Sequence, residues 1–448
     1  MRHTKICSAI MALILTFSIF VTPSSAAFEP PFTVSSGASY MVNLDTDIVV
    51  FDKNSTEKMY PASLTKIMTL IVMLENTDDL EGTYVKAPSF LFDEFYGIGV
   101  SNADIRPNET VNLKDLAYAL MLRSACEAAS IIGWYVGGEN LDNFVAMMNE
   151  KAQEIGAVNT RYANAHGLFD ENQYTTAYDV YLITKYALDN LPLFQDISCT
   201  TSWTMEATSY HTEPRTIYHT NTMLDVGLGG EYYYPYVKGI KTGTLPEAGL
   251  CLVTMGSKNG YSYLLATLGG PQYDKDGNPL AKKTSYTDHI NLYNWAFDGF
   301  KYTSVISTDE EIMEFAIEQS AGNDYVILKP NTSFGTLLPS NVDKTSVQRI
   351  LPEKQTLVAP VEAGTVLGKM ELRFEGETLA VIDLVAAESV ERSEFLYVLD
   401  KLKILVASGW FKLAVIVLSV LIVFYIVLFI VLNRRRKKLK QVKKRRKF

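Results

Sequence analysis

Residues 61–66 read Pro-Ala-Ser-Leu-Thr-Lys and place a serine three positions before a lysine. Proline suits the first turn of a helix, and the residues behind Pro61 continue the helical pattern. Apolar side chains recur there at intervals of three or four, at Leu64, Ile67, Met68, Ile71 and Leu74. Ser63 and Lys66 therefore share one face of the predicted helix, where the lysine amine can take the hydroxyl proton.

The spacing of Ser63 and Lys66 is a weak signal by itself, because Ser55 and Lys58 repeat it in a polar turn. The helical context favours Ser63, since the positive end of the helix dipole lies beside it. A lysine exposed to water is protonated at neutral pH and cannot accept a proton. Lys66 must therefore be desolvated or lie near other cations to act as a base.

A second motif, Lys241-Thr242-Gly243, lies in a region that reads as antiparallel strands over residues 241–244, 251–255 and 261–268. On a strand, the ammonium of Lys241 and the hydroxyl of Thr242 can both bind a substrate carboxylate. Gly243 lets that substrate lie close to the backbone. Upstream, the periodicity predicts one helix from about Leu113 to Trp134.

After about Ser304 the sequence changes to short strands and turns. Apolar Met370, Leu372 and Phe374 alternate with charged residues before a turn at Gly376, and the chain returns through another strand. We expect a small β-sandwich here.

Both ends of the chain carry membrane signals. Residues 1–26 combine Arg2 and Lys5, a short apolar run and small residues, which predicts a cleaved signal peptide; an uncleaved anchor is the alternative. Residues 413–432 are twenty uncharged, mostly aliphatic residues, the length of a membrane-spanning helix. Residues 433–448 add eleven basic residues and no acid. The positive-inside rule predicts a cytoplasmic tail, although a nucleic-acid-binding arm is the other interpretation.

Composition excludes several classes of protein. The net charge is -9 although the tail is basic, so the rest is strongly acidic and an unlikely binder of nucleic acid. Four cysteines without a C-x-x-C pair indicate neither a disulfide framework nor a zinc site. The five histidines form no metal-binding pattern, and G-x-S-x-G and G-x-G-x-x-G motifs are missing. We predict no metal and no cofactor.

Together, residues 61–66 and 241–243 resemble the motifs of the penicillin-recognising serine hydrolases. The D-alanyl-D-alanine carboxypeptidase branch is the most similar, and the resemblance covers about Ser39 to Arg392. It also rests on residues 239–243, 247–253, 164–168, 174–179, 359–361 and 364–368. The resemblance implies a β-lactamase/transpeptidase-like α/β domain, with an antiparallel sheet flanked by helices and a helical subdomain, followed by the β-sandwich. The apolar run 413–432 adds one C-terminal transmembrane helix to the expected fold.

The resemblance also implies site residues. Ser63 would be the nucleophile, Lys66 its base, and Ser124 would help to pass a proton to the leaving amine. Lys241, Thr242, Gly243, Thr244 and Cys126 would contact the substrate. Backbone N–H groups of Ser63 and Thr244 would hold the oxyanion.

One position departs clearly from the family pattern. Cys126 stands where the family usually has asparagine, and a thiol is a weak donor and acceptor. It either lines the site or is a small buried hydrophobe. Smaller departures occur at Leu245, Gln173 and Tyr178.

The resulting hypothesis is a membrane-anchored serine carboxypeptidase that trims the terminal D-alanine from peptidoglycan stem peptides and is acylated by β-lactams. Its expected segments are a signal peptide (1–26), a catalytic domain (27–303), a β-rich domain (304–394), a juxtamembrane linker (395–412), the span (413–432) and the tail (433–448). The first two domains would be extracytoplasmic. The alternatives are a sensor or scaffold that lost catalysis with the asparagine, and a transpeptidase or β-lactamase outcome of the same acylation.

Overall fold

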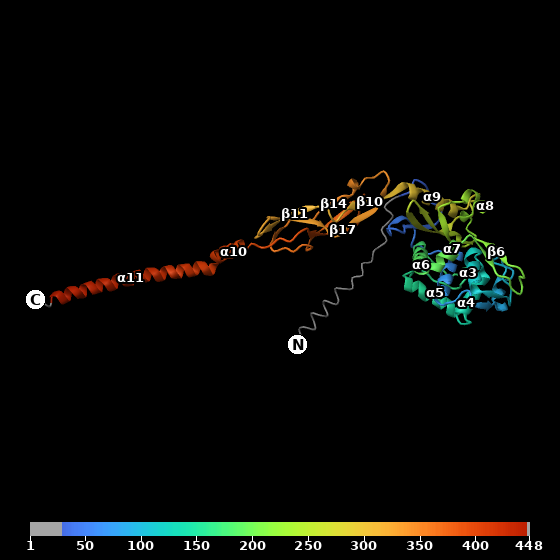
Figure 1. Ribbon diagram of the computed structural model, residues 1–448, viewed down its shortest axis with the longest axis horizontal. Coiled ribbons are helices and arrows are strands. Elements are labelled where there is room, and N and C mark those ends of the chain that lie inside the picture. The colour runs from blue at the N-terminus through green and yellow to red at the C-terminus, as the bar shows by residue number, and fades with distance from the viewer. Residues whose placement is uncertain (1–28, 446–448) are drawn as a thin grey trace. The chain divides into compact units, whose positions relative to one another are not determined.

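The computed structural model describes residues 29–445, and side chains as far as residue 437. The predicted signal peptide lies outside this range. The chain forms two compact units. One contains the chain as far as Tyr302 together with Thr336–Val342, and the other contains Thr303–Gly335 and the chain from Asp343 onward. Figure 1 shows the elements of each unit.

A five-stranded antiparallel sheet organises the first unit. Its order is β2 (Val49–Lys53), β1 (Ala38–Asn43), β9 (Tyr261–Gly270), β8 (Gly249–Lys258) and β7 (Val237–Leu245). The antiparallel strands predicted between residues 241 and 268 are confirmed. Both faces of the sheet are buried, each by a separate hydrophobic core. Alternate residues of a strand point to opposite faces, so one strand contributes side chains to both cores. In β9, Tyr263 and Leu265 enter one core, whereas Leu264 and Ala266 enter the other.

Helices cover the two faces. One face packs against α9 (Thr284–Gly299), whose Leu292, Tyr293 and Ala296 are fully buried. The other face meets a group of helices, which Figure 1 shows gathered on one side of the unit. These are α2 (Thr65–Glu75), α3 (Leu113–Leu122), α4 (Cys126–Val136), α5 (Leu141–Ile155), α6 (Ala177–Asn190) and α7 (Pro192–Cys199).

The predicted single helix from Leu113 to Trp134 is wrong. The chain forms α3 and α4 instead, separated at residues 123–125, where Ser124 adopts a left-handed backbone conformation with φ 58°. The sequence contains neither glycine nor proline at this break, and the apolar periodicity continues across it. The sequence pattern therefore does not reveal the break. The break turns the chain toward β7 and the start of α2.

Short elements complete the first unit. The strands are β3 (Tyr84–Lys86) with β4 (Thr110–Asn112), and β5 (Ser202–Met205) with β6 (Arg215–Tyr218). The helical turns are η1 (Ala62–Leu64), η2 (Ser89–Phe95), η3 (Thr222–Leu224), α8 (Val226–Gly229) and η4 (Gly230–Tyr232).

The second unit is rich in β-structure. Its main sheet has the order β14 (Gln348–Ile350), β16 (Val366–Phe374), β17 (Glu377–Ala386), β12 (Tyr325–Pro330), β11 (Met313–Glu318) and β15 (Thr356–Val358). Met370, Leu372 and Phe374 are buried as their alternation predicts. The turn η5 (Lys344–Ser346) also belongs to this unit. Two further strands, β10 (Phe300–Ile306) and β13 (Phe334–Pro339), pair with each other, and each contains residues assigned to both units.

Two helices end the described chain. The stretch expected as a juxtamembrane linker contains α10 (Glu394–Ala407), and α11 (Gly409–Arg445) includes the predicted span. The segment Gly409–Lys437 is long and apolar enough to cross a membrane. Its aliphatic side chains are exposed along its whole length, as they are in a helix that faces lipid.

Asp288 joins α9 to the beginning of the described chain. Its carboxylate is buried and accepts hydrogen bonds from the backbone N–H groups of Ser35 and Ser36, at 3.0 and 2.7 Å, and from the Ser36 hydroxyl at 2.7 Å. We predict that Asp288→Ala destabilises the first unit by about 2–4 kcal/mol, because three donors lose their acceptor. Thermal unfolding of the detergent-solubilised chain measures this loss.

Asp298→Ala is the matched control. Asp298 is also on α9, but its side chain is 69% exposed and pairs with Lys258 at the surface. An exposed pair contributes at most about 1 kcal/mol. Equal losses of stability in the two variants would contradict the role given to Asp288.

Candidate active site

Residues 61–66 form a tight turn and the beginning of α2. Ala62 has a positive φ of 47°, and Ser63 lies in the turn η1 immediately before the helix. Lys66 occupies the first turn of α2 and is completely buried. Its Nζ lies 3.0 Å from the hydroxyl oxygen of Ser63. The structure therefore brings together the serine and the lysine that the sequence paired.

The buried Lys66 amine contacts three polar groups. Besides Ser63, its amine contacts the backbone carbonyl of His166, and the Cys126 thiol at 3.6 Å. Burial lowers the pKa of Lys66 from its usual value. A neutral amine has two N–H groups and one lone pair. The carbonyl of His166 takes one N–H group and the thiol can take the other, which leaves the lone pair for the Ser63 hydroxyl.

The carbonyl of His166 belongs to the segment 164–168, which packs beneath α2. Thr69 donates to the neighbouring carbonyl of Ala165 at 2.6 Å. The His166 ring lies 3.1 Å from a Glu94 carboxylate oxygen, and burial lowers the pKa of His166. Gly167 has φ 84°, and a Cβ there would lie 2.1 Å from the carbonyl oxygen of Ala62. This close approach allows only glycine beside the turn that carries Ser63.

At the break between α3 and α4, Ser124 lines the cavity whereas Cys126 contacts Lys66. Ser124 is buried, lines the same cavity as Ser63, and its hydroxyl is without a hydrogen-bond partner in the described structure. Cys126 is only 2% exposed, and its thiol faces Lys66 rather than the cavity. The thiol thus lies behind the wall of the cavity, beside the lysine amine.

Strand β7 forms the opposite wall. Thr242, Gly243 and Thr244 line the cavity, whereas the Lys241 side chain is fully buried. The Lys241 amine donates to the carbonyl of Thr242 at 3.1 Å. Burial and the nearby Lys66 hold the pKa of Lys241 well below its usual value. Lys241 therefore contributes no exposed positive charge to the cavity.

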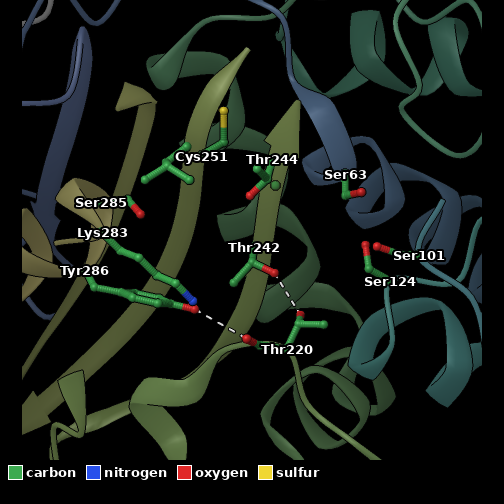
Figure 2. Close-up of a pocket in the computed structure, with 12 residues that line it drawn as sticks. Ser63, Ser101, Ser124, Thr220, Thr242, Thr244, Cys251, Lys283, Ser285 and Tyr286 are labelled. Carbon is green, nitrogen blue, oxygen red and sulfur yellow. Dashed lines mark hydrogen bonds between the residues drawn. The ribbon is translucent and has the colours of Figure 1, made fainter. Parts of the chain in front are cut away.

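The cavity between these walls has a volume of about 210 Å³ and is mostly polar (Figure 2). The Thr220 and Thr242 hydroxyls are 2.7 Å apart, and the Tyr286 hydroxyl donates to the carbonyl of Thr220 at 3.3 Å. The described residues that line it are Ser63, Ser101, Ser124, Thr220, Thr242, Gly243, Thr244, Leu250, Cys251, Lys283, Ser285 and Tyr286.

Several of these residues were not predicted from the sequence. Lys283, Ser285 and Tyr286 come from the start of α9, and Ser101 and Thr220 come from loops. None belongs to a recognisable motif; the only signal is the polar run before the apolar pattern of α9. Lys283 is exposed and is the one cation among the described lining residues. Figure 2 shows its amine beside Tyr286, directed toward Thr220.

Comparisons with known proteins agree with this geometry. Residues 24–272, more than half of the chain, match the family model "D-alanyl-D-alanine carboxypeptidase", and residues 300–392 match "Penicillin-binding protein 5, C-terminal domain". The chain is 25% identical over 366 residues to the D-alanyl-D-alanine carboxypeptidase DacF of Bacillus subtilis, covering 81% of this chain and 88% of DacF. It is 23% identical over 397 residues to DacC of Escherichia coli, covering 86% and 91%.

Solved structures show the same fold. The D-alanyl-D-alanine carboxypeptidase DacD of Francisella tularensis superposes with a TM-score of 0.62 at 18% identity, covering 82% of this chain and 96% of that one. A Streptomyces DD-transpeptidase gives a TM-score of 0.53 at 24% identity, covering 60% of this chain and 99% of that one. The predicted fold class, a serine hydrolase domain followed by a small β-sandwich domain, is confirmed.

The contact of Gly167 with the Ser63 turn is testable by comparison with Gly156. Both glycines have positive φ, 84° and 91°, but a Cβ at Gly156 would meet open space. We predict that Gly156→Ala costs about 1–2 kcal/mol from backbone strain alone. Gly167→Ala adds a steric clash that displaces η1, so it also slows acylation by a fluorescent penicillin.

Both variants are measured by thermal unfolding and by the second-order rate of labelling. Labelling of Gly167→Ala at the rate of Gly156→Ala would contradict the argument that Gly167 positions the serine.

Proposed function

The chain belongs to the D-alanyl-D-alanine carboxypeptidase family, and we propose that it removes the terminal D-alanine from peptidoglycan stem peptides with Ser63 as its nucleophile. It is a serine peptidase of the penicillin-binding type, so peptidoglycan is its substrate class and β-lactams bind it. We propose that β-lactams acylate Ser63. The observation that carries the assignment of the nucleophile is the 3.0 Å contact between the Ser63 hydroxyl and a buried lysine amine.

In the proposed first step, Ser63 Oγ attacks the carbonyl carbon of the penultimate D-alanine while the neutral Lys66 amine takes the hydroxyl proton. The lowered pKa of Lys66 favours the neutral amine more than in an exposed lysine. As the pH falls through that pKa, the amine is protonated and acylation slows. Backbone N–H groups of Ser63 and Thr244 would stabilise the oxyanion.

In the second step, the carbon–nitrogen bond breaks and the leaving amine takes a proton. Ser124 is suited to pass this proton, because its hydroxyl lines the cavity and is without another partner among the described residues. Water then attacks the ester on Ser63. The products are free D-alanine, the shortened peptide and the original hydroxyl, so atoms and charges balance.

The free carboxylate of the substrate requires a positive charge and hydrogen-bond donors. The sequence suggested Lys241 for this charge, together with Thr242. In the structure the Lys241 amine is enclosed and its pKa lowered, whereas Lys283 projects into the cavity near the Thr220 and Thr242 hydroxyls. We therefore propose that Thr242 and Thr220 orient the carboxylate and that Lys283 supplies its counter-charge. Lys241 would act from behind the wall, through its proximity to Lys66.

We further propose that α11 anchors the enzyme in the membrane, with the preceding domains outside the cell and the basic tail inside. The length and apolarity of the segment Gly409–Lys437 support anchoring. The basic residues that begin at Arg434 support the orientation, because such residues remain on the cytoplasmic side.

The proposed activity predicts that the detergent-solubilised chain releases D-alanine from a stem pentapeptide and that Ser63→Ala lowers this release by about 10³-fold or more. Ser55→Ala is the matched control, because Ser55 has the same spacing to a lysine but hydrogen-bonds Asp52. D-alanine release and covalent penicillin labelling are measured on the same preparations.

Each other outcome has a definite meaning. Persistent labelling or release in Ser63→Ala would exclude Ser63 as the nucleophile. Wild-type chain that takes up penicillin but releases no D-alanine would indicate the sensor or scaffold, unless an added amine acceptor captures the acyl group, which would indicate a transpeptidase.

The role of Lys283 predicts that Lys283→Gln lowers kcat/KM for the pentapeptide by about 10- to 100-fold, the worth of a charge-assisted hydrogen bond. The same variant should lose the preference for a free carboxylate over a carboxamide terminus. Lys282→Gln is the control, because Lys282 pairs with Glu231 at the surface and does not line the cavity. An undiminished preference for the carboxylate in Lys283→Gln would exclude Lys283 as the anchor.

A further inference from the structure

The cavity lacks the amide that the family usually provides at position 126. An asparagine side chain there offers both donors and an acceptor, whereas the Cys126 thiol is weak in both roles and faces Lys66. Cys126 is not among the residues that line the cavity. If the site binds a peptide as proposed, another group must form the polar contact on this side.

Ser101 is placed to form that contact. It lies on the loop between η2 and β4, is exposed, and lines the cavity together with Ser63 and Ser124. In Figure 2 the Ser101 and Ser124 hydroxyls both point into the cavity from the wall that carries Ser63, opposite Thr242 and Thr244. The backbone N–H of Cys126 donates to the carbonyl of Ser101 at 2.9 Å. Ser101 is therefore bonded directly to the position at which the family usually has asparagine.

The loop that carries Ser101 is held firmly at its next positions. Glu127, the residue after Cys126, is buried, and its carboxylate accepts from the backbone N–H groups of Ala103 at 2.7 Å and Ile105 at 3.5 Å. The start of α4 thus binds the loop through Cys126 and Glu127 together.

Residues from two other segments add to this attachment. The Arg123 guanidinium donates to the carbonyl of Asn102, and the Arg215 guanidinium donates to the carbonyl of Ala103, both at 3.4 Å. The His211 ring lies 2.8 Å from the carbonyl of Asp104. A loop held at successive residues presents a side chain in one place, as substrate positioning requires.

We propose that Ser101 is a substrate-binding residue of this enzyme and that its hydroxyl donates to an amide carbonyl of the bound stem peptide, replacing the amide that Cys126 does not provide. The inference rests on the proposed function, because it concerns the same peptide in the same cavity. A hydroxyl is a full donor and acceptor, unlike a thiol. Ser101 reaches the cavity from a loop, whereas Cys126 reaches only the lysine.

The test is a double-mutant cycle of Ser101→Ala and Cys126→Asn in the full chain. Ser101→Ala should lower kcat/KM for D-alanine release, and the second-order rate of penicillin acylation, by about 3- to 10-fold, the worth of one neutral hydrogen bond. In the Cys126→Asn background the same change should cost less than about 2-fold, because the restored amide takes over the contact. Ser209→Ala, at an exposed serine of the same unit, is the control and should match wild type.

Two results would overturn the proposal. Unchanged kinetics in Ser101→Ala would show that the hydroxyl is not used, and equal losses in both backgrounds would show that it does not replace the amide. Thermal unfolding separates these results from a structural effect, because alanine keeps the backbone carbonyl that Cys126 binds. Failure of the proposed function is distinguishable, since wild-type chain would then release no D-alanine while the acylation rates still test Ser101.

Discussion

Two lysine amines are buried in the same core, and the proposed chemistry of the site depends on this arrangement. Lys66 and Lys241 are both fully buried, and the proximity of Lys66 adds to the burial that lowers the pKa of Lys241. Charged amines are expensive to bury, so this core favours their neutral forms. A neutral amine next to a serine hydroxyl is a base. In the proposed mechanism, the helices and the sheet that bury Lys66 would therefore contribute to catalysis.

Two lysines of the site are buried and a third, Lys283, is exposed. The two buried amines contact backbone carbonyls, the Cys126 thiol and the Ser63 hydroxyl, all within the protein. The exposed Lys283 lies at the start of α9, on the side of the cavity that also holds Thr220 and Thr242. In the proposed mechanism, one site would thus combine a base that must be neutral with an anion-binding group that must be charged. Different degrees of burial allow lysine to serve in both roles.

Backbone conformation, rather than side-chain type alone, delivers the hydroxyl groups. Ser63 follows Ala62, whose φ is positive, and Ser124 has a positive φ itself. Such conformations are costly for residues other than glycine and persist where the surrounding packing enforces them. Ala62 begins η1 and Ser124 lies between α3 and α4, and the hydroxyls of Ser63 and Ser124 lie at one cavity. The contact of Gly167 with the Ala62 carbonyl shows how closely the neighbouring segment fits the first of these turns.

The sequence alone determined the serine and lysine pair, the Lys241-Thr242-Gly243 strand, the antiparallel sheet, the β-rich second domain and the apolar C-terminal helix. These features depend on short-range spacing and periodicity, which a linear pattern contains. Tertiary structure alone decided that α3 and α4 are separate, that Cys126 faces Lys66, and that Ser101, Thr220 and Lys283 reach the cavity. These features depend on contacts between residues far apart in the chain. Local pattern also cannot report burial, which determines whether a lysine is a neutral base or a positive charge.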